Sequence, residues 1–349
     1  MPKPRIVTGY RPTGKLHLGH WFGNLQNMIA MQHDYQAFWF IADWHALTSH
    51  WQDSSHIRVF TEEMVLDWCA AGIDPSVSTI YRQSDVFEVA ELALYFDMIT
   101  PMGWLERVPS YKEQREQITD KDLSNVGFFL YPTLMAADIA ITLAEAVPVG
   151  EDQAPHLELT REIVRRFNGT WGEYLVEPKA LIPKEGARVP GLDGRKMSKS
   201  YGNSIFISDS PDEIRAKVMS MITDPARKLK TDPGDPDICP LQQIHKLIAQ
   251  PGEIAEWDRC CRAADCGCVA HKKKLIDDLT EYLRAFREKR AELAATPGFA
   301  WEVLAAGAER VRPVAEEVIA NCRTRIRLDG AEAPASAVER DADDAEKPF

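Results

Sequence analysis

The first 207 residues alternate between short apolar runs and longer segments with helical periodicity. Four runs are rich in β-branched and aromatic residues and are bounded by Gly, Asp or Ser, as is typical of buried strands: 5–9, 36–43, 78–84 and 146–150. Between them, apolar residues recur every three or four positions, as helices require. This alternation predicts an α/β fold with a Rossmann-like, doubly wound parallel sheet, whose ligand site lies at the carboxyl ends of the strands.

The pattern changes after Ile207. Residues 210–213, Ser-Pro-Asp-Glu, combine an N-cap, a proline at the first helical position and an acid three residues after the cap, so they predict a helix that extends to about Met221. Further helices are predicted near 241–249, 269–295 and 301–323. We therefore expect an α/β domain over 1–207 with a helical insertion at about 100–140, a helical domain over 208–330, and a disordered acidic tail over 331–349.

Composition excludes several classes of protein. A chain of 349 residues with 45% hydrophobic and 27% charged residues is typical of a globular protein with about two domains. The net charge of −12 repels nucleic acid and acidic membranes, so a polyanionic partner must use local basic patches. No clean apolar stretch of about 20 residues is present, and the first ten residues lack a signal sequence. We expect a cytoplasmic protein with reduced thiols and neither membrane nor DNA as a partner.

Residues 9–15 begin like a phosphate-binding P-loop, G-x-x-x-x-G-K. The next residue is Leu16, where that loop needs Ser or Thr to hold Mg²⁺, so a P-loop NTPase is disfavoured. The alternative is a Gly/Pro turn that leads from a strand into a helix.

His17-Leu18-Gly19-His20 follows this turn, where the expected helix begins. The free N–H groups of a helix N-terminus and two imidazoles three residues apart suit an anionic phosphate, and Gly19 lets a flat base or ribose approach the backbone. Histidines that serve the core or a metal are the alternative.

A second cationic motif lies in a glycine-rich loop much further along the chain. Lys196-Met-Ser-Lys199-Ser200 offers two ammonium groups and two hydroxyls, which suit a flexible clamp for a triphosphate. Taken alone, such a loop is more often solvated surface.

Together these motifs resemble the signatures of class I aminoacyl-tRNA synthetases. Residues 12–20 match P-x-x-G-x-H-x-G-H, the HIGH signature, and residues 196–200 match KMSKS letter for letter. Residues 131–139, 147–161 and 182–189 resemble the bacterial type of the tryptophanyl-tRNA synthetase family. The resemblance is strong over about 5–207 and looser beyond.

This resemblance implies a homodimer that activates L-tryptophan with ATP and Mg²⁺ and then transfers it to tRNA(Trp). A tyrosine-specific synthetase and a tRNA-binding paralogue without catalysis are the alternatives. Lysines and arginines over 272–290 and 323–327 supply local positive charge, and the family binds the tRNA anticodon with this part of the chain.

The resemblance also implies roles for single residues. The catalytic residues would be His17, His20, Lys196 and Lys199. The remaining residues implied to bind ATP are Arg11, Pro12, Thr13, Gly19, Gly150, Glu151, Asp152, Val189, Met197, Ser198 and Ser200. Asp152 would bind the ribose, and Met197 and Val189 would flank adenine. Many members carry Gln in place of Arg11.

The amino-acid site is predicted on one helix face. Tyr131, Met135 and Asp138 are spaced i, i+4, i+7 and form an apolar face that ends in a single carboxylate. Indole is a large apolar body with one N–H donor and no acceptor, so such a slot suits it. By resemblance, Gln153 and Tyr131 hold the amino and carboxyl groups, and His45 lies nearby.

Five of the seven cysteines fall between positions 239 and 268. Cys239, Cys261, Cys268 and His271 resemble the four-cysteine pattern that binds a [4Fe-4S] cluster in some family members. The first spacing is one residue short, and histidine replaces the last cysteine. Cys260 and Cys266 are alternative ligands, zinc is an alternative metal, and a vestigial site without metal is equally compatible with the sequence.

Overall fold

The computed structural model describes residues 3–108, 123–150, 153–181, 189–229 and 231–330. Five parallel strands form one sheet in the order β3-β2-β1-β4-β5. They are β1 (Arg5–Tyr10), β2 (Gln36–Ile41), β3 (Thr79–Arg82), β4 (Ala146–Pro148) and β5 (Lys179–Leu181). The predicted α/β class is confirmed. The sequence did not predict β5, because its three residues are exposed or only half-buried and carry no apolar pattern.

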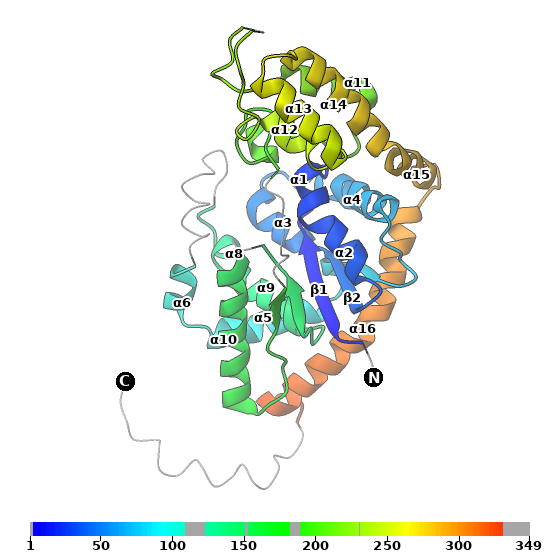
Figure 1. Ribbon diagram of the computed structural model, residues 1–349. Helices are drawn as coiled ribbons and strands as arrows, with labels where there is room; N and C mark the ends of the chain where they lie inside the picture. The colour runs from blue at the N-terminus through cyan, green and yellow to red at the C-terminus, as the bar shows by residue number, and fades with distance from the viewer. Residues whose placement is uncertain (1–2, 109–122, 151–152, 182–188, 230, 331–349) are drawn as a thin grey trace.

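Helices cover both faces of the sheet, as alternating side chains of each strand require (Figure 1). On one face, Ile6 and Trp39 pack with the cluster that includes α2 (Gln26–Met31) and α4 (Ile57–Ala71). On the other, Val7 and Phe38 pack with α5 (Glu88–Ile99), α9 (Tyr131–Ala140) and α10 (Ala154–Trp171). The sheet is therefore doubly wound. The shorter helices in this part of the chain include α3 (Asp43–His50), α6 (Met102–Glu106) and α8 (Val126–Phe129).

The described residues of 211–294 form only helices and loops, which lie beyond the carboxyl edge of the sheet at the top of Figure 1. The helices are α11 (Pro211–Ser220), α12 (Pro240–His245), α13 (Pro251–Arg262), α14 (Cys268–Tyr282) and α15 (Arg284–Ala294). The predicted capping box is present: Ser210 and Glu213 each accept a hydrogen bond from the other's backbone N–H. The helix predicted over 269–295 is divided at Leu283, where the backbone leaves helical geometry.

The last helix, α16 (Phe299–Ile326), leads back from the other C-terminal helices to the sheet (Figure 1), where it packs against β3. Gly307 makes this approach possible, because a Cβ atom there would lie 1.7 Å from the carbonyl oxygen of Ile80. Beyond it, Val311 and Ala315 enter the same core as α5 and α10. Although it follows the other C-terminal helices in sequence, α16 thus completes the packing of the sheet. Among the described residues, no helix combines the length and apolarity that crossing a bilayer would need.

Candidate active site

The two signature motifs lie side by side at the carboxyl end of β1. His17 is the N-cap of the short helix α1 (Leu18–His20), which continues into one π-helical turn, Trp21–Leu25. The N–H of Leu18 donates to the carbonyl of Ile205 at 3.0 Å, and the N–H of Ile207 donates to the carbonyl of Leu16 at 3.0 Å. This small ladder fixes the HIGH segment against the chain that leaves the KMSKS loop.

The two signature histidines are packed ring against ring. Their centroids are 3.8 Å apart, and the backbone N–H of His17 donates to Nδ1 of His20 at 3.1 Å. Burial, together with Lys199 and Lys196, lowers the pKa of His17 to about 4. Burial and the neighbouring His17 ring also hold the pKa of His20 well below its usual range. Both imidazoles are therefore neutral at neutral pH and act as hydrogen-bonding groups, not as cations.

Asn203 organises the KMSKS loop. Its Oδ1 accepts from the N–H of Ser198 at 2.8 Å, and its Nδ2 donates to Oδ1 of Asp193 at 2.7 Å and to the carbonyl of Lys196 at 3.3 Å. A Cβ atom at Gly191 would lie 2.2 Å from this amide, so only glycine fits there. No pattern in the sequence marks Asn203, since a polar residue in a loop is not part of a periodic repeat.

Lys199 connects the loop to the turn after β1. Its ammonium donates to the carbonyl of Gly14 at 3.1 Å, and the left-handed backbone of Gly14, at φ +135°, leaves room for the lysine stem. Burial and the nearby Arg11 lower the pKa of Lys199 to about 8. Lys199 thus stands beside the histidine pair as a partly desolvated cation.

The other residues predicted to bind ATP are distributed around this point. Met197 and Val189 are 3% exposed and pair through a backbone hydrogen bond of 3.0 Å, whereas Lys196 and Arg11 are exposed. Ser200 lies in the helical turn Lys199–Tyr201. Pro12 and Thr13 lie in the turn after β1, Gly19 lies in α1, and Gly150 follows β4 at the same edge of the sheet. Glu151 and Asp152 lie outside the described residues, as do 182–188.

A buried polar triad lies beneath the predicted amino-acid slot. Asp138 on α9 is 1% exposed, and its two carboxylate oxygens accept from Nε2 of Gln83 at 2.8 and 2.9 Å. Nε2 of His45 lies 2.9 Å from Oδ2 of the same carboxylate. Burial raises the pKa of Asp138, while the bonds to His45 and Gln83 oppose that rise. The structure thus brings Asp138 and His45 together.

Gln83, which sequence analysis missed, holds this triad in place. Its Oε1 accepts from the N–H of Trp44 at 3.1 Å, so both ends of the amide are used. Its position directly after β3, at the ligand-binding edge of a parallel sheet, was the one available signal.

The rest of the predicted slot lies on α9 and at the start of α10. The Tyr131 hydroxyl and Nε2 of His156 are 2.7 Å apart, and the Tyr131 ring packs on Phe128 with centroids 5.5 Å apart. Tyr131 also interacts electrostatically with Arg11, which connects the slot to the nucleotide motif. Met135 is half-buried on the same helix, and Gln153 is the N-cap of α10.

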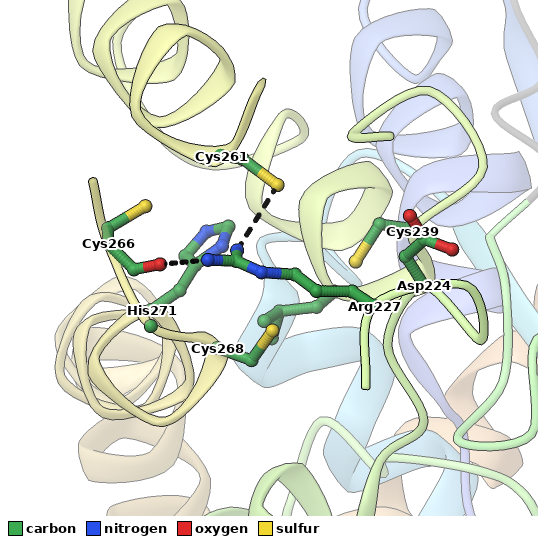
Figure 2. A pocket seen from close by; sticks show the side chains of 9 residues that line it. Asp224, Arg227, Cys239, Cys261, Cys266, Cys268 and His271 are labelled. Carbon is green, nitrogen blue, oxygen red and sulfur yellow. Dashed lines mark hydrogen bonds between the residues drawn. The ribbon is translucent and has the colours of Figure 1, made fainter. Parts of the chain in front are cut away.

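A second pocket lies among the C-terminal helices. Figure 2 shows that cysteine and histidine side chains surround the guanidinium of Arg227, whose Nη1 lies 3.6 Å from Sγ of Cys261 and whose Nη2 donates to the carbonyl of Cys266. All four predicted ligands line this pocket: Cys239, Cys261, Cys268 and His271. The neighbouring Cys260 and Cys266 lie close to each other, with Cα atoms 5.5 Å apart.

The predicted ligands in this pocket are three thiols and one imidazole. A tetrahedral zinc ion, with Zn–S of about 2.3 Å, holds its ligand sulfurs about 3.8 Å apart. Among the described residues, the one compact group of possible ligands, within 4.8 Å of one another, is His245, Glu253 and Asp278, which includes no cysteine. The thiols and His271 stand further apart around a common space. Thiols are soft donors of the kind that bind iron-sulfur clusters and zinc, and the ligands of a cluster bind different iron atoms, so they need not converge on one point.

Much of the basic surface predicted to face tRNA is engaged in ion pairs. Arg290 donates to Asp67 on α4 at 2.6 Å, Lys274 pairs with Glu253 and Asp278, and Arg323 pairs with Glu91. Except for Lys274 with Asp278, which both belong to α14, these pairs connect different helices.

Comparison with known proteins identifies the class to which this fold and site belong. Residues 2–284 match the family model described as tRNA synthetases class I (W and Y). Curated relatives include the tryptophan–tRNA ligase of Thermotoga maritima, 44% identical over 93% of this chain and 99% of that protein. That of Aquifex aeolicus is 39% identical, over 93% of this chain and all of that one.

A solved structure agrees with these relatives. Tryptophanyl-tRNA synthetase from Campylobacter jejuni, complexed with ADP and tryptophan, superposes with a TM-score of 0.85 at 36% identity, over 93% of this chain and 100% of that one. The chain belongs to the tryptophan–tRNA ligase family of the class I aminoacyl-tRNA synthetases.

Proposed function

We propose that this chain activates L-tryptophan with ATP to tryptophanyl-adenylate and pyrophosphate, and then transfers the tryptophanyl group to the 3′ end of tRNA(Trp). The observation that carries this proposal is the junction of the two signature motifs: the contact from Lys199 to Gly14 and the backbone ladder between Leu18 and Ile205. The HIGH segment carries two imidazoles and the KMSKS loop carries two lysines. These segments lie far apart in sequence but meet at the carboxyl edge of a parallel sheet, where α/β folds bind nucleotides.

In the first step, a carboxylate oxygen of tryptophan attacks the α-phosphorus, a new P–O bond forms, and the bond to pyrophosphate breaks. No protein nucleophile is required, so catalysis consists of positioning and of stabilising charge on the phosphoryl oxygens. The neutral His17 and His20 rings offer directed hydrogen bonds to the phosphates. Lys199 and Lys196 stabilise the negative charge that develops on the leaving pyrophosphate. Mg²⁺ bound together with ATP would neutralise further phosphate charge.

In the second step, a ribose hydroxyl at the tRNA 3′ end attacks the carbonyl carbon of the adenylate. The new ester bond forms as the bond to AMP breaks, and the hydroxyl proton passes to a phosphate oxygen of the departing AMP. We assign the binding of the nucleotide in both steps to the residues around β1 and the KMSKS loop, with Met197 and Val189 beside the adenine and Asp152 at the ribose.

Selection of tryptophan is assigned to Asp138. Its carboxylate is held by Gln83 and His45, and both of these are donors, so the carboxylate retains lone pairs for one more donor. The indole N–H supplies that donor, and Tyr131, Met135 and Gln153 hold the rest of the amino acid. An apolar slot that ends in an acceptor disfavours phenylalanine, which would leave the carboxylate desolvated and one partner short.

The protein is proposed to work as a cytoplasmic homodimer. A face at the start and along the length of α5 exposes large apolar side chains: Phe87 is 71% exposed, Leu94 51% and Met98 73%. The spacing of these residues places them on one side of the helix, and Met102 of α6, 67% exposed, continues the apolar surface. A second copy that covered this face would remove a contiguous apolar patch from water.

Cys239, Cys261, Cys268 and His271 are proposed to hold an iron-sulfur cluster, with zinc as the second candidate. Bound there, the metal would connect α12, α13 and α14 and stabilise this helical unit. Arg227 stands beside the thiols as a positive charge that suits an anionic group.

The direct test is aminoacylation. The purified protein is incubated with ATP, Mg²⁺ and labelled tryptophan or tyrosine, each with tRNA(Trp) or tRNA(Tyr) transcripts. We expect acid-precipitable label only with tryptophan and tRNA(Trp). Charging with tyrosine would assign the protein to the other amino acid of the family, and charging with neither would indicate a paralogue without catalysis.

A further inference from the structure

Three side chains form a hydrogen-bonded chain that starts at the cysteine pocket. Nε2 of His271 and Nδ1 of His245 are 2.9 Å apart, and Nε2 of His245 lies 2.8 Å from Oδ2 of Asp278. His245 is completely buried, and Asp278 is paired with Lys274 at 2.5 Å near the surface. Neither His245 nor Asp278 lines the pocket, and their hydrogen-bonded connection to it passes through His271.

The carboxylate of Asp278 indicates which nitrogen atoms of His245 and His271 carry hydrogen. Asp278, as an ionised carboxylate, only accepts, so Nε2 of His245 carries the hydrogen atom. A neutral imidazole has one donor and one acceptor, so Nδ1 of His245 is an acceptor. In this arrangement Nε2 of His271 donates to it, and Nδ1 of His271 keeps its lone pair.

Metal ligation by a histidine requires such a lone pair. Metal-binding imidazoles usually donate their other N–H to a fixed acceptor, which sets the tautomer and the ring orientation. The His271 ring is also stacked on Trp257, with centroids 4.3 Å apart and planes 8° apart, which restricts rotation of the ring. Both the proton and the plane of His271 are thereby set before any metal arrives.

We propose that His245 and Asp278 are positioning residues that hold His271 in the tautomer whose Nδ1 can serve as the fourth ligand of a metal centre in the cysteine pocket. This inference rests on the metal centre proposed above. It also explains why histidine can replace cysteine at position 271: the buried neighbour prepares it as a neutral nitrogen donor.

The acidic residues at the Asp278 end of this hydrogen-bonded series do not form a metal site of their own. His245, Glu253 and Asp278 converge, but the Lys274 ammonium lies 2.6 Å from Glu253 and 2.5 Å from Asp278. The lysine therefore occupies the position that a cation would take, and its charge keeps the Asp278 carboxylate ionised as the terminal acceptor.

The test measures metal binding directly. The full-length protein is purified without oxygen and reconstituted with Fe²⁺, sulfide and a thiol reductant. Iron and sulfide per chain, visible absorbance and resistance to a graded chelator are then measured. We expect His245→Leu, which fills the buried space but cannot hydrogen-bond, to weaken iron retention about 10- to 100-fold. Asp278→Asn should act in the same direction. His245→Gln should restore retention, because its amide can both accept from His271 and donate to Asp278.

A double-mutant cycle separates positioning from general damage to the fold. In a His271→Cys background the ligand is a thiolate that needs no tautomer, so adding His245→Leu should cost less than threefold. His156→Leu, which removes another buried histidine far from the pocket, controls for the loss of a buried imidazole.

The outcomes separate the two proposals. Wild-type protein that takes up neither iron nor zinc would overturn the metal centre and this inference with it. Wild-type protein that retains iron while His245→Leu behaves like wild type, or weakens retention equally in the His271→Cys background, would overturn the positioning role alone.

Discussion

Replacing Asp138 with alanine is expected to damage the use of tryptophan far more than the use of ATP. In the structure the carboxylate already accepts from Gln83 and His45 and is 1% exposed, so an indole N–H would bond to a desolvated charged acceptor. Such a bond contributes about 1.5–3 kcal/mol. At 1.4 kcal/mol per factor of ten, kcat/KM for tryptophan in pyrophosphate exchange should fall about 10- to 150-fold. The KM for ATP should change less than twofold.

Stability must be separated from recognition in this experiment. Alanine leaves the donors of Gln83 and His45 unpaired, at about 1–3 kcal/mol for each buried group, so unfolding is measured in parallel. Asp138→Asn preserves the side-chain volume and one hydrogen-bond acceptor, so both its stability and its kcat/KM for tryptophan should fall less than those of Asp138→Ala. Asp97→Asn is the matched control, because Asp97 bonds to Thr133 on the same helix but lies outside the proposed slot.

A substrate analogue isolates the single hydrogen bond. Benzothienylalanine replaces the indole N–H with sulfur and keeps the size of the ring system. Wild-type protein should prefer tryptophan over this analogue by about 10- to 150-fold, and Asp138→Ala should prefer neither. If the variant retained the wild-type preference, Asp138 would not be the indole acceptor and the reasoning would fail.

Three further perturbations address the other parts of the structure. Lys199 has a pKa of about 8 and is charged only below it, so kcat/KM for ATP in exchange should fall as pH rises through about 8. Lys199→Arg should remove that decline, and Lys199→Met should lower kcat about 10²- to 10³-fold at every pH. A wild-type kcat/KM that did not change with pH would contradict the role of Lys199. Asn203→Ala should slow exchange about tenfold or more without changing tryptophan binding by equilibrium dialysis, since it frees only the KMSKS loop. Gly307→Ala should destabilise the fold in urea by at least about 3 kcal/mol, because its Cβ would overlap the Ile80 carbonyl. The control Gly169→Ala, at an exposed helical position, should be neutral or stabilising. Equal urea midpoints for the two variants would argue against the packing of α16 on β3.

Much of the fold could be predicted from local patterns. The four buried strands, the capping box at Ser210 and the alternation of strands and helices all depend on neighbouring residues, and each is present. The exposed β5 and the break at Leu283 carry no local signal. The return of α16 to the sheet depends on the close contact at Gly307, which becomes visible only when β3 is in place.

The residues of the candidate site likewise include some that the sequence reveals and others that only the folded structure reveals. Motif residues such as His17 and Lys199 are recognisable because their order and spacing repeat a known signature. The groups that position them are not, because Gln83 and Asn203 act through contacts between distant segments. The negative charge of the chain was also a weak guide, since ion pairs such as Arg290 with Asp67 use many of the basic residues internally.

The most direct test of the central claim is ATP–pyrophosphate exchange measured separately with each of the twenty amino acids. We predict exchange that depends on tryptophan, with tyrosine and phenylalanine lower in kcat/KM by about 10⁴ or more. Exchange that is strongest with tyrosine, or no exchange with any amino acid, would contradict the account.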